Sequence, residues 1–519
     1  MAVTGACWVL TLFLMVVTSE GKNVVFLPME ATSHARIHAF VAVELAKMGH
    51  HVWVALSEAL HKGNVEKYPG VTTFTYNTYS ELSEDKLIAD IETTIYNAIT
   101  NGTDPDWAWL KLLQSHVSNT YFKAMSRGHL IEYIDSLKPD LIVLEGFPDV
   151  DERVAISYKL KVPFALVTTL FAQTPIRMPL NPTAEAYNNR YIRTEANFFE
   201  TIIAVMKVMS LRIVHLFNDR GYMKQLFPTD PDVPAANELF SQAEVYLIES
   251  DPLNDYPRPA PPNVKLIGGI CAGPPQELKE PFKSFIARSE KAGVGVALLS
   301  FGSLCMNLPK EGERKIIAAL KRLNLNTIWR ANISSPDPGK ILTSTWLPQN
   351  DLLGNKNVKV FISHAGAHSI YEALYHAVPT VCVPLFYDQQ YNADRAEDKG
   401  HCISIDIIKA SEDELVSVIE RVLSSKEMKA TVSKASAIYR ELYKNPKQEA
   451  AYWLDHVMRH GGEYMRESGQ KIPMVLYILD YIIVFLVGVI STILVFLIVH
   501  LLKLLSRFSL RSDEHVKNE

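Results

Sequence analysis

The stretch that decides the fold runs from residue 346 to residue 395 and reads WLPQNDLLGNKNVKVFISHAGAHSIYEALYHAVPTVCVPLFYDQQYNADR. Its apolar run at 358–363 predicts a buried strand, and the apolar spacing at 369–376 predicts a helix that begins soon after it. The small residues between them predict a turn whose backbone N–H groups lie at the positive end of the helix dipole. This arrangement indicates a site for a diphosphate.

A second strand, predicted at 380–384, ends in the sequence PLFYDQQ and brings Asp388 and Gln389 to a carboxyl edge. Their hydrogen-bonding groups suit sugar hydroxyls, and Trp346 offers an aromatic face for a base. Each piece alone is typical of an ordinary strand-to-helix turn, in which Asp388 and Gln389 cap the loop. All the pieces together, in this order and spacing, favour a ligand that carries a base, a diphosphate and a sugar.

Strands and helices alternate on both sides of this stretch. Apolar runs before residue 250 predict strands at 22–27, 51–56, 140–144 and 164–168 and a helix at 37–48. Residues 251–281 are dense in proline and glycine, which is typical of a linker between domains. Beyond them, strands are predicted at 295–301 and 327–329 and helices at 316–323 and 413–423. The pattern predicts two α/β halves with parallel sheets, whose ligands bind beyond the carboxyl ends of the strands and between the halves.

Two apolar segments at the ends of the chain indicate its compartment. Residues 8–17 are apolar and precede small residues, which predicts a secretory signal; an uncleaved anchor is the alternative. Residues 474–502 are long enough to cross a bilayer, and the part from 481 onward has no charged side chain. Lys503, Arg507 and Arg511 follow, so this end should face the cytosol in a type I protein. The alternative, a buried core helix, fits a run of this length poorly.

The overall composition excludes several classes of protein. The chain has 519 residues, with 52 Lys and Arg against 57 Asp and Glu, so its net charge is −5 and no nucleic-acid partner is expected. Its five cysteines are sparse and form no CxxC pair, so neither a metal site nor a disulfide framework is expected, and any pairing stays open. Asn101 and Asn332 begin Asn-x-Ser/Thr sequons and are candidate glycosylation sites.

The segment 346–395 closely resembles the signature of the UDP-glycosyltransferase family, in particular its animal UDP-glucuronosyltransferase branch. The resemblance extends to PRP at 257–259, GGI at 268–270, SFGS at 300–303 and LD at 479–480. It implies an α/β protein of the GT-B fold, in which two Rossmann-like domains face each other across a cleft, followed by one C-terminal transmembrane helix. The expected divisions are a signal peptide (1–21), an acceptor-binding half (22–255), a linker (256–285), a UDP-sugar-binding half (286–445), a helical return and juxtamembrane segment (446–473), a transmembrane helix (474–502) and a cytosolic tail (503–519).

The resemblance also assigns roles in the donor site. It implies that Trp346 stacks on uracil beside Gln349, that Glu372 accepts from the ribose hydroxyls, and that Asp388 and Gln389 bind the sugar. The diphosphate is expected on the remaining residues of the turn and its surroundings, with Arg330 supporting them: Ser303, His364, Gly366, His368 and Ser369.

The chain departs from the family pattern at two positions in this turn. Ala365 stands where the family usually has glycine, which costs little unless the backbone there needs a positive φ. His368 stands where the family commonly has asparagine, and it can still donate to a phosphate, although its tautomer and charge then matter.

A histidine is the predicted general base. Ser33-His34 follows the first predicted strand, at the place where the family's Ser-His carries the base, and histidine titrates near neutral pH. A surface histidine is the alternative reading, and His38 is interpreted as a decoy one helical turn further on. The family's base is oriented by an aspartate, but the matching position here holds Glu145; Asp149 and Asp151 are the alternatives.

The leaving group, UDP, is expected to be stabilised by backbone amides and a helix dipole, so no metal and no cofactor is predicted. The sequence therefore predicts an inverting transferase that moves a glucuronosyl or hexosyl unit, glucose among them, from a UDP-sugar to hydroxyl groups of small lipophilic acceptors. It is expected in the endoplasmic reticulum membrane with both halves in the lumen, and a homo- or hetero-oligomer is left open. The competing hypotheses are a catalytically impaired relative that binds UDP-sugar or lipophile as a partner or carrier, and a receptor-type lumenal protein.

Overall fold

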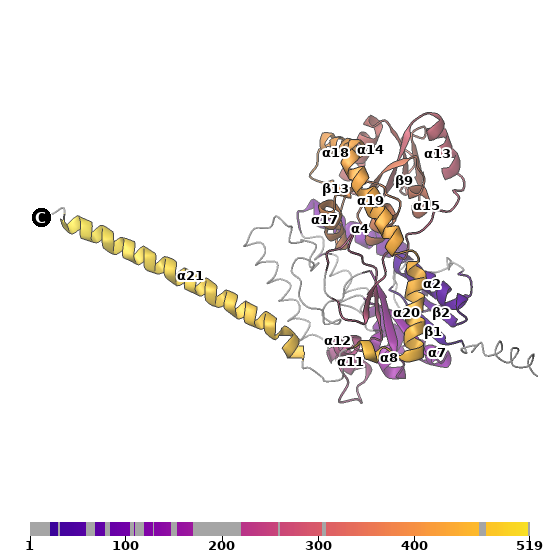
Figure 1. Ribbon diagram of the computed structural model, residues 1–519, viewed down its shortest axis with the longest axis horizontal. Coiled ribbons are helices and arrows are strands. Elements are labelled where there is room, and N and C mark those ends of the chain that lie inside the picture. Colours follow the sequence, from indigo (N-terminus) through magenta and orange to yellow (C-terminus); the bar gives the residue numbers. More distant parts are fainter. Residues whose placement is uncertain are drawn as a thin grey trace, which may run out of the picture.

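Two parallel β-sheets organise the chain, one in each half (Figure 1). The computed structural model describes residues 21–29, 32–58, 68–77, 84–103, 108, 119–127, 129–146, 153–169, 220–257, 260–303, 308–466 and 474–516. The predicted signal at 1–21 therefore lies almost entirely outside the described residues.

The first sheet has seven strands in the order β3-β2-β1-β4-β5-β6-β7. Its strands are β1 (Asn23–Leu27), β2 (His51–Ser57), β3 (Val71–Tyr76), β4 (Leu141–Glu145), β5 (Phe164–Thr168), β6 (Tyr246–Ile248) and β7 (Val264–Leu266). The helices described in this half are α2 (Thr32–Lys47), α4 (Glu84–Thr100), α6 (Asn119–Arg127), α7 (Leu130–Ser136), α8 (Val154–Leu160), α11 (Arg220–Leu226) and α12 (Ala236–Phe240).

The second sheet has six strands in the order β10-β9-β8-β11-β12-β13. Its strands are β8 (Gly295–Ser300), β9 (Leu325–Arg330), β10 (Ile341–Ser344), β11 (Val358–Ser363), β12 (Thr380–Cys382) and β13 (Cys402–Ser404). The helices of this half are α13 (Phe282–Lys291), α14 (Lys310–Arg322), α15 (Gln349–Leu353), α16 (Ala367–Tyr375), α17 (Asp388–Asp398), α18 (Glu412–Ser424) and α19 (Lys426–Leu442).

The strands are apolar throughout because both faces of each sheet are covered. In β1, Val25 and Leu27 face one apolar cluster, whereas Val24 and Phe26 face another that includes α2. Helices on both faces are the usual consequence of parallel strands joined by right-handed crossovers. In both sheets the strand order reverses beside the first strand of the half, between β1 and β4 and between β8 and β11. Ligands of such folds bind at these reversal points, beyond the carboxyl ends of the strands.

The last helices tie the two halves together. Helix α19 packs on α16 in the second half, and α20 (Pro446–His460) then packs against α2 in the first (Figure 1). Ala450, Ala451 and Leu454 of α20 are fully buried in the same cluster as Val41 of α2. The chain therefore returns to its first half before a short 3-10 turn, η2 (Glu463–Met465), leads towards the C-terminal helix.

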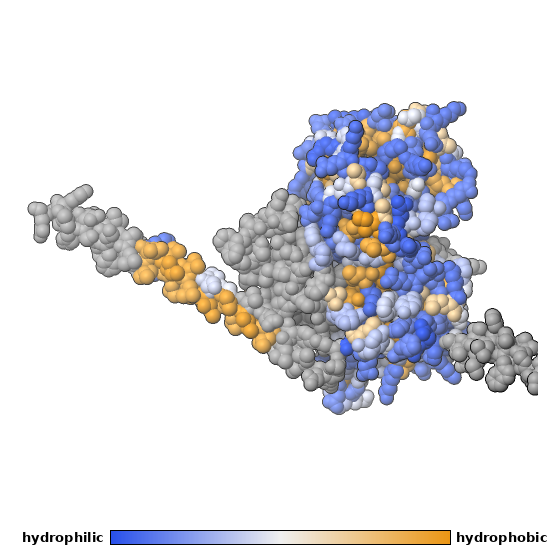
Figure 2. Space-filling view, viewed as in Figure 1, coloured by the Kyte–Doolittle hydropathy of each residue, from blue (hydrophilic) through white to orange (hydrophobic). Residues whose placement is uncertain are grey.

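The final helix, α21 (Met474–Val516), projects from this body (Figure 1). Its segment Phe485–Lys503 has a mean hydropathy of 2.8 and is not buried in the protein, so it is long and apolar enough to cross a membrane. Figure 2 shows this apolar stretch beside a body whose visible surface is largely hydrophilic.

The structure differs from the sequence-based expectation in two places that affect the site. The stretch predicted as a linker contains β7, because Val264–Leu266 is apolar enough to complete the first sheet. Helix α2 begins at Thr32, five residues before the predicted start, so His34 lies in its first turn and not in a loop. Cys271, Cys382 and Cys402 are free thiols.

Candidate active site

The predicted catalytic pair meets at the reversal point of the first sheet. His34 lies in the first turn of α2, which follows β1, and Glu145 is the last residue of the neighbouring strand β4. The Nδ1 atom of His34 lies 3.1 Å from Oε1 of Glu145. This contact is off-axis for a hydrogen bond, so it is an ion-pair contact whose alignment is incomplete.

His38 contacts the other oxygen of the same carboxylate. Its Nε2 atom lies 3.0 Å from Oε2 of Glu145, in good hydrogen-bond geometry. His34 and His38 are four residues apart, so both project from the same face of α2 towards the strand end. His38 therefore shares the carboxylate of Glu145 with the predicted base, a contact that the interpretation of His38 as a decoy did not foresee.

Glu145 is almost completely buried, yet it is ionised. Burial alone would raise the pKa of its carboxyl group, but the charge of His34 and the contacts with both histidines hold that pKa well below its usual range. Asp149 and Asp151, the alternative partners, lie outside the described residues. Arg153, which sequence reasoning missed, is buried beside the pair and donates to the carbonyl oxygens of Leu27 and Glu145 at the ends of β1 and β4.

The turn after β11 forms the centre of the predicted diphosphate site. Ala365 has a φ of 64°, so the position does need the left-handed backbone and alanine there is strained relative to glycine. His364 sits between two glycines on separate loops. A Cβ atom at either Gly302 or Gly366 would lie 2.4 Å from its Nε2 atom, so both glycines are required by the close approach of the ring.

His364 is neutral in this setting. Burial, with a smaller contribution from the positive charge of Arg330, lowers the pKa of His364 to about 4. Arg330 itself is held by its Nε, which donates to the carbonyl of Thr345 at 3.1 Å. Ser303 lies just beyond the end of β8, and β8 is the strand that pairs with β11. Ser303 therefore reaches the same edge of the sheet as His364. A neutral imidazole beside a helix N-terminus can donate to a phosphate but adds no charge.

Two residues predicted to hold the nucleoside, Gln349 and Glu372, lie on α15 and α16, and Ser369 of the predicted diphosphate site lies beside them. Gln349 donates from Nε2 to Oε2 of Glu372 at 2.6 Å and to the Ser369 hydroxyl at 3.0 Å. Burial raises the pKa of Glu372 to about 7, against the opposing effect of the Gln349 hydrogen bond. Trp346 lies nearby in sequence and is 55% exposed, so its ring is available to a ligand. The structure thus brings Gln349 into direct contact with both Glu372 and Ser369.

Asp388 and Gln389 begin α17, directly after a strained residue. Tyr387 has φ 58° and ψ −128°, a backbone conformation that residues other than glycine rarely adopt. The Oε1 atom of Gln389 accepts from the backbone of Leu385 and Phe386, so this side chain caps its own loop, which is the alternative that the sequence left open. Burial raises the pKa of Asp388, and its carboxylate accepts a hydrogen bond from the Asn392 side chain at 2.7 Å.

His368 links the donor-site turn to the first half. It lies in the first turn of α16, and its Nε2 atom is 3.1 Å from Oε2 of Glu249, which follows β6. Burial, the largest single influence, lowers the pKa of His368. The charge and hydrogen bond of Glu249, together with the charges of Glu372 and Glu145, outweigh burial and raise that pKa. The rings of His368 and His34 are 6.4 Å apart, so the predicted base faces the donor-site turn. Sequence reasoning missed Glu249, although its position after an apolar run was the available signal.

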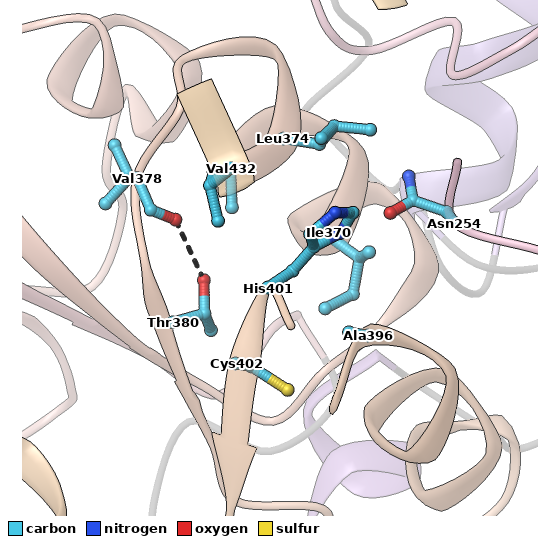
Figure 3. Close-up of a pocket in the computed structure, with 10 residues that line it drawn as sticks. Asn254, Ile370, Leu374, Val378, Thr380, Ala396, His401, Cys402 and Val432 are labelled. Atoms are coloured by element: carbon cyan, nitrogen blue, oxygen red, sulfur yellow. Dashed lines mark hydrogen bonds between the residues drawn. The ribbon is translucent and has the colours of Figure 1, made fainter. Parts of the chain in front are cut away.

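A small cavity lies apart from this constellation, behind α16 (Figure 3). Its lining includes Asn254, Ile370, His401 and Cys402, and burial lowers the pKa of His401 to about 4. None of the predicted catalytic or donor-binding residues lines it, and it is too small for a nucleotide. Within the described part of the chain, no three His, Cys, Asp or Glu side chains are placed to hold a metal ion.

Comparison with known proteins identifies the family. The sequence profile described as "UDP-glucoronosyl and UDP-glucosyl transferase" matches residues 22–515. The chain belongs to this UDP-glycosyltransferase family. UDP-glucuronosyltransferase 1-2 of Mus musculus is 25% identical over 485 residues, which are 92% of this chain and 90% of that protein. UDP-glucuronosyltransferase 2B15 of Homo sapiens is 27% identical over 467 residues, or 87% of each chain.

Another relative carries a different sugar specificity in its name. The 2-hydroxyacylsphingosine 1-beta-galactosyltransferase of Mus musculus is 26% identical over 505 residues, which are 95% of this chain and 90% of that protein. Among solved structures, the glycotransferase of kitacinnamycin matches 85% of this chain and 100% of its own with a TM-score of 0.58 at 16% identity. Spinosyn forosaminyltransferase SpnP matches the same shares with a TM-score of 0.56 at 15% identity. These structures confirm the GT-B fold, and family membership makes this UDP-glycosyltransferase an enzyme.

Proposed function

We propose that this UDP-glycosyltransferase transfers a glucuronosyl or hexosyl unit from a UDP-sugar to a hydroxyl group of a small lipophilic acceptor. The observation that carries the proposal is the ion-pair contact between Nδ1 of His34 and Glu145, opposite the donor-site turn. With Nδ1 engaged by the carboxylate, Nε2 is the ring nitrogen left to take a proton from the acceptor. The named acceptor of one relative, 2-hydroxyacylsphingosine, is itself a lipid, which supports the acceptor class.

The reaction proposed for these residues is a single displacement. The acceptor hydroxyl loses its proton to Nε2 of His34 as its oxygen bonds to the anomeric carbon, and the bond from that carbon to the UDP oxygen breaks. Glu145 stabilises the imidazolium that forms. The negative charge on departing UDP meets the N-terminus of α16, with the imidazoles of His364 and His368 beside it. Attack from the face opposite the leaving group inverts the anomeric configuration.

Orientation in the membrane is part of the proposal. An N-terminal signal and a C-terminal span at α21 place both halves in the lumen of the endoplasmic reticulum and leave the tail in the cytosol. The support is the apolar segment Phe485–Lys503 and the Lys and Arg residues after it. The catalytically impaired alternative is not favoured, because the structure keeps a carboxylate on His34 despite the change from aspartate to glutamate.

Donor profiling in membranes tests this function. We expect microsomes that contain the full chain to transfer sugar from at least one of UDP-glucuronate, UDP-glucose and UDP-N-acetylglucosamine to phenols or steroids. The His34→Ala variant should lose transfer while its affinity for UDP persists, because His34 touches the acceptor and not the nucleotide. His129→Ala, a surface histidine paired with Glu132 in the same half, is the matched control and should keep full rate. Full rate in His34→Ala would contradict the proposal.

The identity of the supporting carboxylate needs a separate comparison. We expect Glu145→Gln to lower the rate strongly, because a neutral amide stabilises the imidazolium far less than a carboxylate. Asp149→Asn and Asp151→Asn should retain most of the rate. If either of these two removes transfer and Glu145→Gln does not, the assignment of Glu145 is wrong.

A further inference from the structure

The carboxylate of Glu145 is shared between two histidines, of which the proposed function uses one. Oε1 lies 3.1 Å from His34, off the hydrogen-bond axis, whereas Oε2 lies 3.0 Å from Nε2 of His38 in a well-formed hydrogen bond. His38 is completely buried, and its ring meets Phe26 edge to face at a centroid distance of 5.8 Å. The better-aligned contact is therefore the one to the more deeply buried histidine.

A glutamate at this position has a mechanical problem that an aspartate lacks. Its side chain has one more rotatable bond, so a single off-axis contact to His34 would not fix where the carboxylate points. At 1% exposure, Oε2 has no access to water that would replace a missing donor. The hydrogen bond from His38 removes both difficulties, because it satisfies Oε2 and holds Oε1 facing His34.

The surroundings of His38 indicate its tautomer. Its Nδ1 atom is buried and has no hydrogen-bond partner among the residues that the structure describes. A proton on Nδ1 would be an unsatisfied donor, which costs more than a bare acceptor at that place. A neutral ring with its proton on Nε2 is the form that fits, and it donates that proton to Glu145.

We propose that His38 is a positioning residue of the transfer reaction: it holds Glu145 through Oε2 and thereby sets the orientation and basicity of His34. This inference rests on the proposed function of His34 and extends it. A donor on Oε2 withdraws negative charge from the carboxylate, so His34 is a weaker base than it would be beside a glutamate with one donor.

Other charged groups face the pair and have to stay constant in a test. Arg153, beside α8, donates to the backbone carbonyl of Glu145. Across the cleft, His368 on α16 lies 6.4 Å from the His34 ring, with Glu249 behind it. Asp388 on α17 is close enough for the charge of His34 to lower its pKa. Substitutions at His38 leave all of these in place.

Two substitutions at residue 38 separate positioning from packing. His38→Leu fills the space but removes the donor, whereas His38→Gln keeps an N–H group at a similar reach. With UDP-glucuronate or UDP-glucose and 1-naphthol, we expect His38→Leu to lower kcat roughly tenfold or more, the worth of one hydrogen bond to a charged group, with little change in the KM for the donor. Its acidic limb in kcat/KM should move to higher pH, because the carboxylate left with one partner binds the imidazolium proton more tightly. His38→Gln should restore both.

The matched control is His50→Leu in the same half. His50 is also buried and pairs with a carboxylate, with Nε2 3.3 Å from Oδ1 of Asp455, but it lies outside the site. We expect this variant to lose stability without moving the acidic limb. Two results would overturn the inference and leave His38 a packing residue. One is an acidic limb of kcat/KM in His38→Leu that stays in place or moves to lower pH. The other is a loss of kcat of equal size in His38→Leu and His38→Gln.

A second readout needs no turnover. The rate at which diethyl pyrocarbonate modifies His34, followed by mass spectrometry against pH in the full chain, reports the pKa of His34 directly. We expect that midpoint to rise in His38→Leu and to return in His38→Gln. If His34→Ala keeps the full transferase rate, the proposed function fails. If His34→Ala is inactive but the midpoint of His34 modification is the same in the wild type and in His38→Leu, only the inference about His38 fails.

Discussion

At the scale of single residues, three buried carboxyl groups of the site differ in charge because their neighbours differ. Two histidines keep Glu145 ionised, whereas burial raises the pKa of Glu372 to about 7 and that of Asp388 above its usual value. A donor such as UDP-glucose brings a negatively charged diphosphate into this region. A carboxyl group with a raised pKa repels it less, which fits our proposal that the charged carboxylate of the site is the one beside His34.

The fit of His364 between two glycines gives a prediction for binding. Gly366 has φ −61°, which alanine adopts freely, so Gly366→Ala differs mainly by a methyl group that meets the His364 ring. We expect it to cost about 1–3 kcal/mol of stability, as overpacking does, and to weaken UDP binding measured by calorimetry. When His364 is also replaced by alanine, Gly366→Ala should cost only about 1 kcal/mol or less of stability. This remaining cost is the preference of the N-cap position for glycine over alanine. The control is Gly273→Ala, where a methyl group meets nothing within 4 Å. Equal costs in both backgrounds would refute the contact.

At the scale of elements, the turn between β12 and α17 stores backbone strain beside Asp388. Tyr387 holds φ 58° and ψ −128° at the N-cap of α17. Glycine accepts this conformation and alanine does not, so we expect Tyr387→Gly to be more stable than Tyr387→Ala by about 1–2 kcal/mol, measured by thermal denaturation of the solubilised full chain. At Lys399, the C-cap of the same helix with φ −81°, the order should reverse. The same order at both positions would show that Tyr387 carries no strain.

Which elements could be predicted from the sequence depended on burial. The predicted strands at 51–56, 164–168 and 358–363 recur as β2, β5 and β11 because both of their faces are covered, which leaves an uninterrupted apolar run. The edge strand β3 was missed because its sequence, VTTFTY, is half polar. Strands of three residues such as β6 and β13 are too short to show a period.

The site was predictable where the chain itself places residues at a strand end, and less so where contacts cross the halves. His34 follows β1 and Glu145 ends the neighbouring strand β4, and the family resemblance implied that these two residues meet. The bond between His368 and Glu249 joins residues 119 positions apart in different halves of the chain, and no local sequence pattern predicts it. His38 was interpreted as a decoy one helical turn after His34, because the sequence does not show that both histidines reach the same carboxylate from one face of α2.

At the scale of the whole molecule, buried polar contacts hold the two halves in register. Asp255, from the segment after β6, pairs with Arg395 of α17 at 2.7 Å and accepts from the Tyr391 hydroxyl at 3.1 Å. Together with the His368–Glu249 pair, these contacts join α16 and α17 to the end of the first sheet. The helices that carry the donor-site residues are thus fixed against the half that carries His34, as a reaction between ligands bound to different halves requires.

The same arrangement makes membrane orientation testable, because the two halves have to lie on one side of the bilayer. The exposed sequon residue Asn101 lies in the first half and Asn332 in the second, and α21 is the one helix in the described residues able to span. A lumenal protein should therefore carry glycans on both, and Asn101→Gln and Asn332→Gln should each remove one glycosidase-sensitive step in electrophoretic mobility. Asn181→Gln is the control, since the proline in Asn181-Pro-Thr183 prevents modification. Loss of both steps in the double variant, with the tail after Lys503 open to protease in sealed microsomes, is the expected result. A wild-type chain that carries no glycan and whose tail is protected would place the catalytic halves in the cytosol.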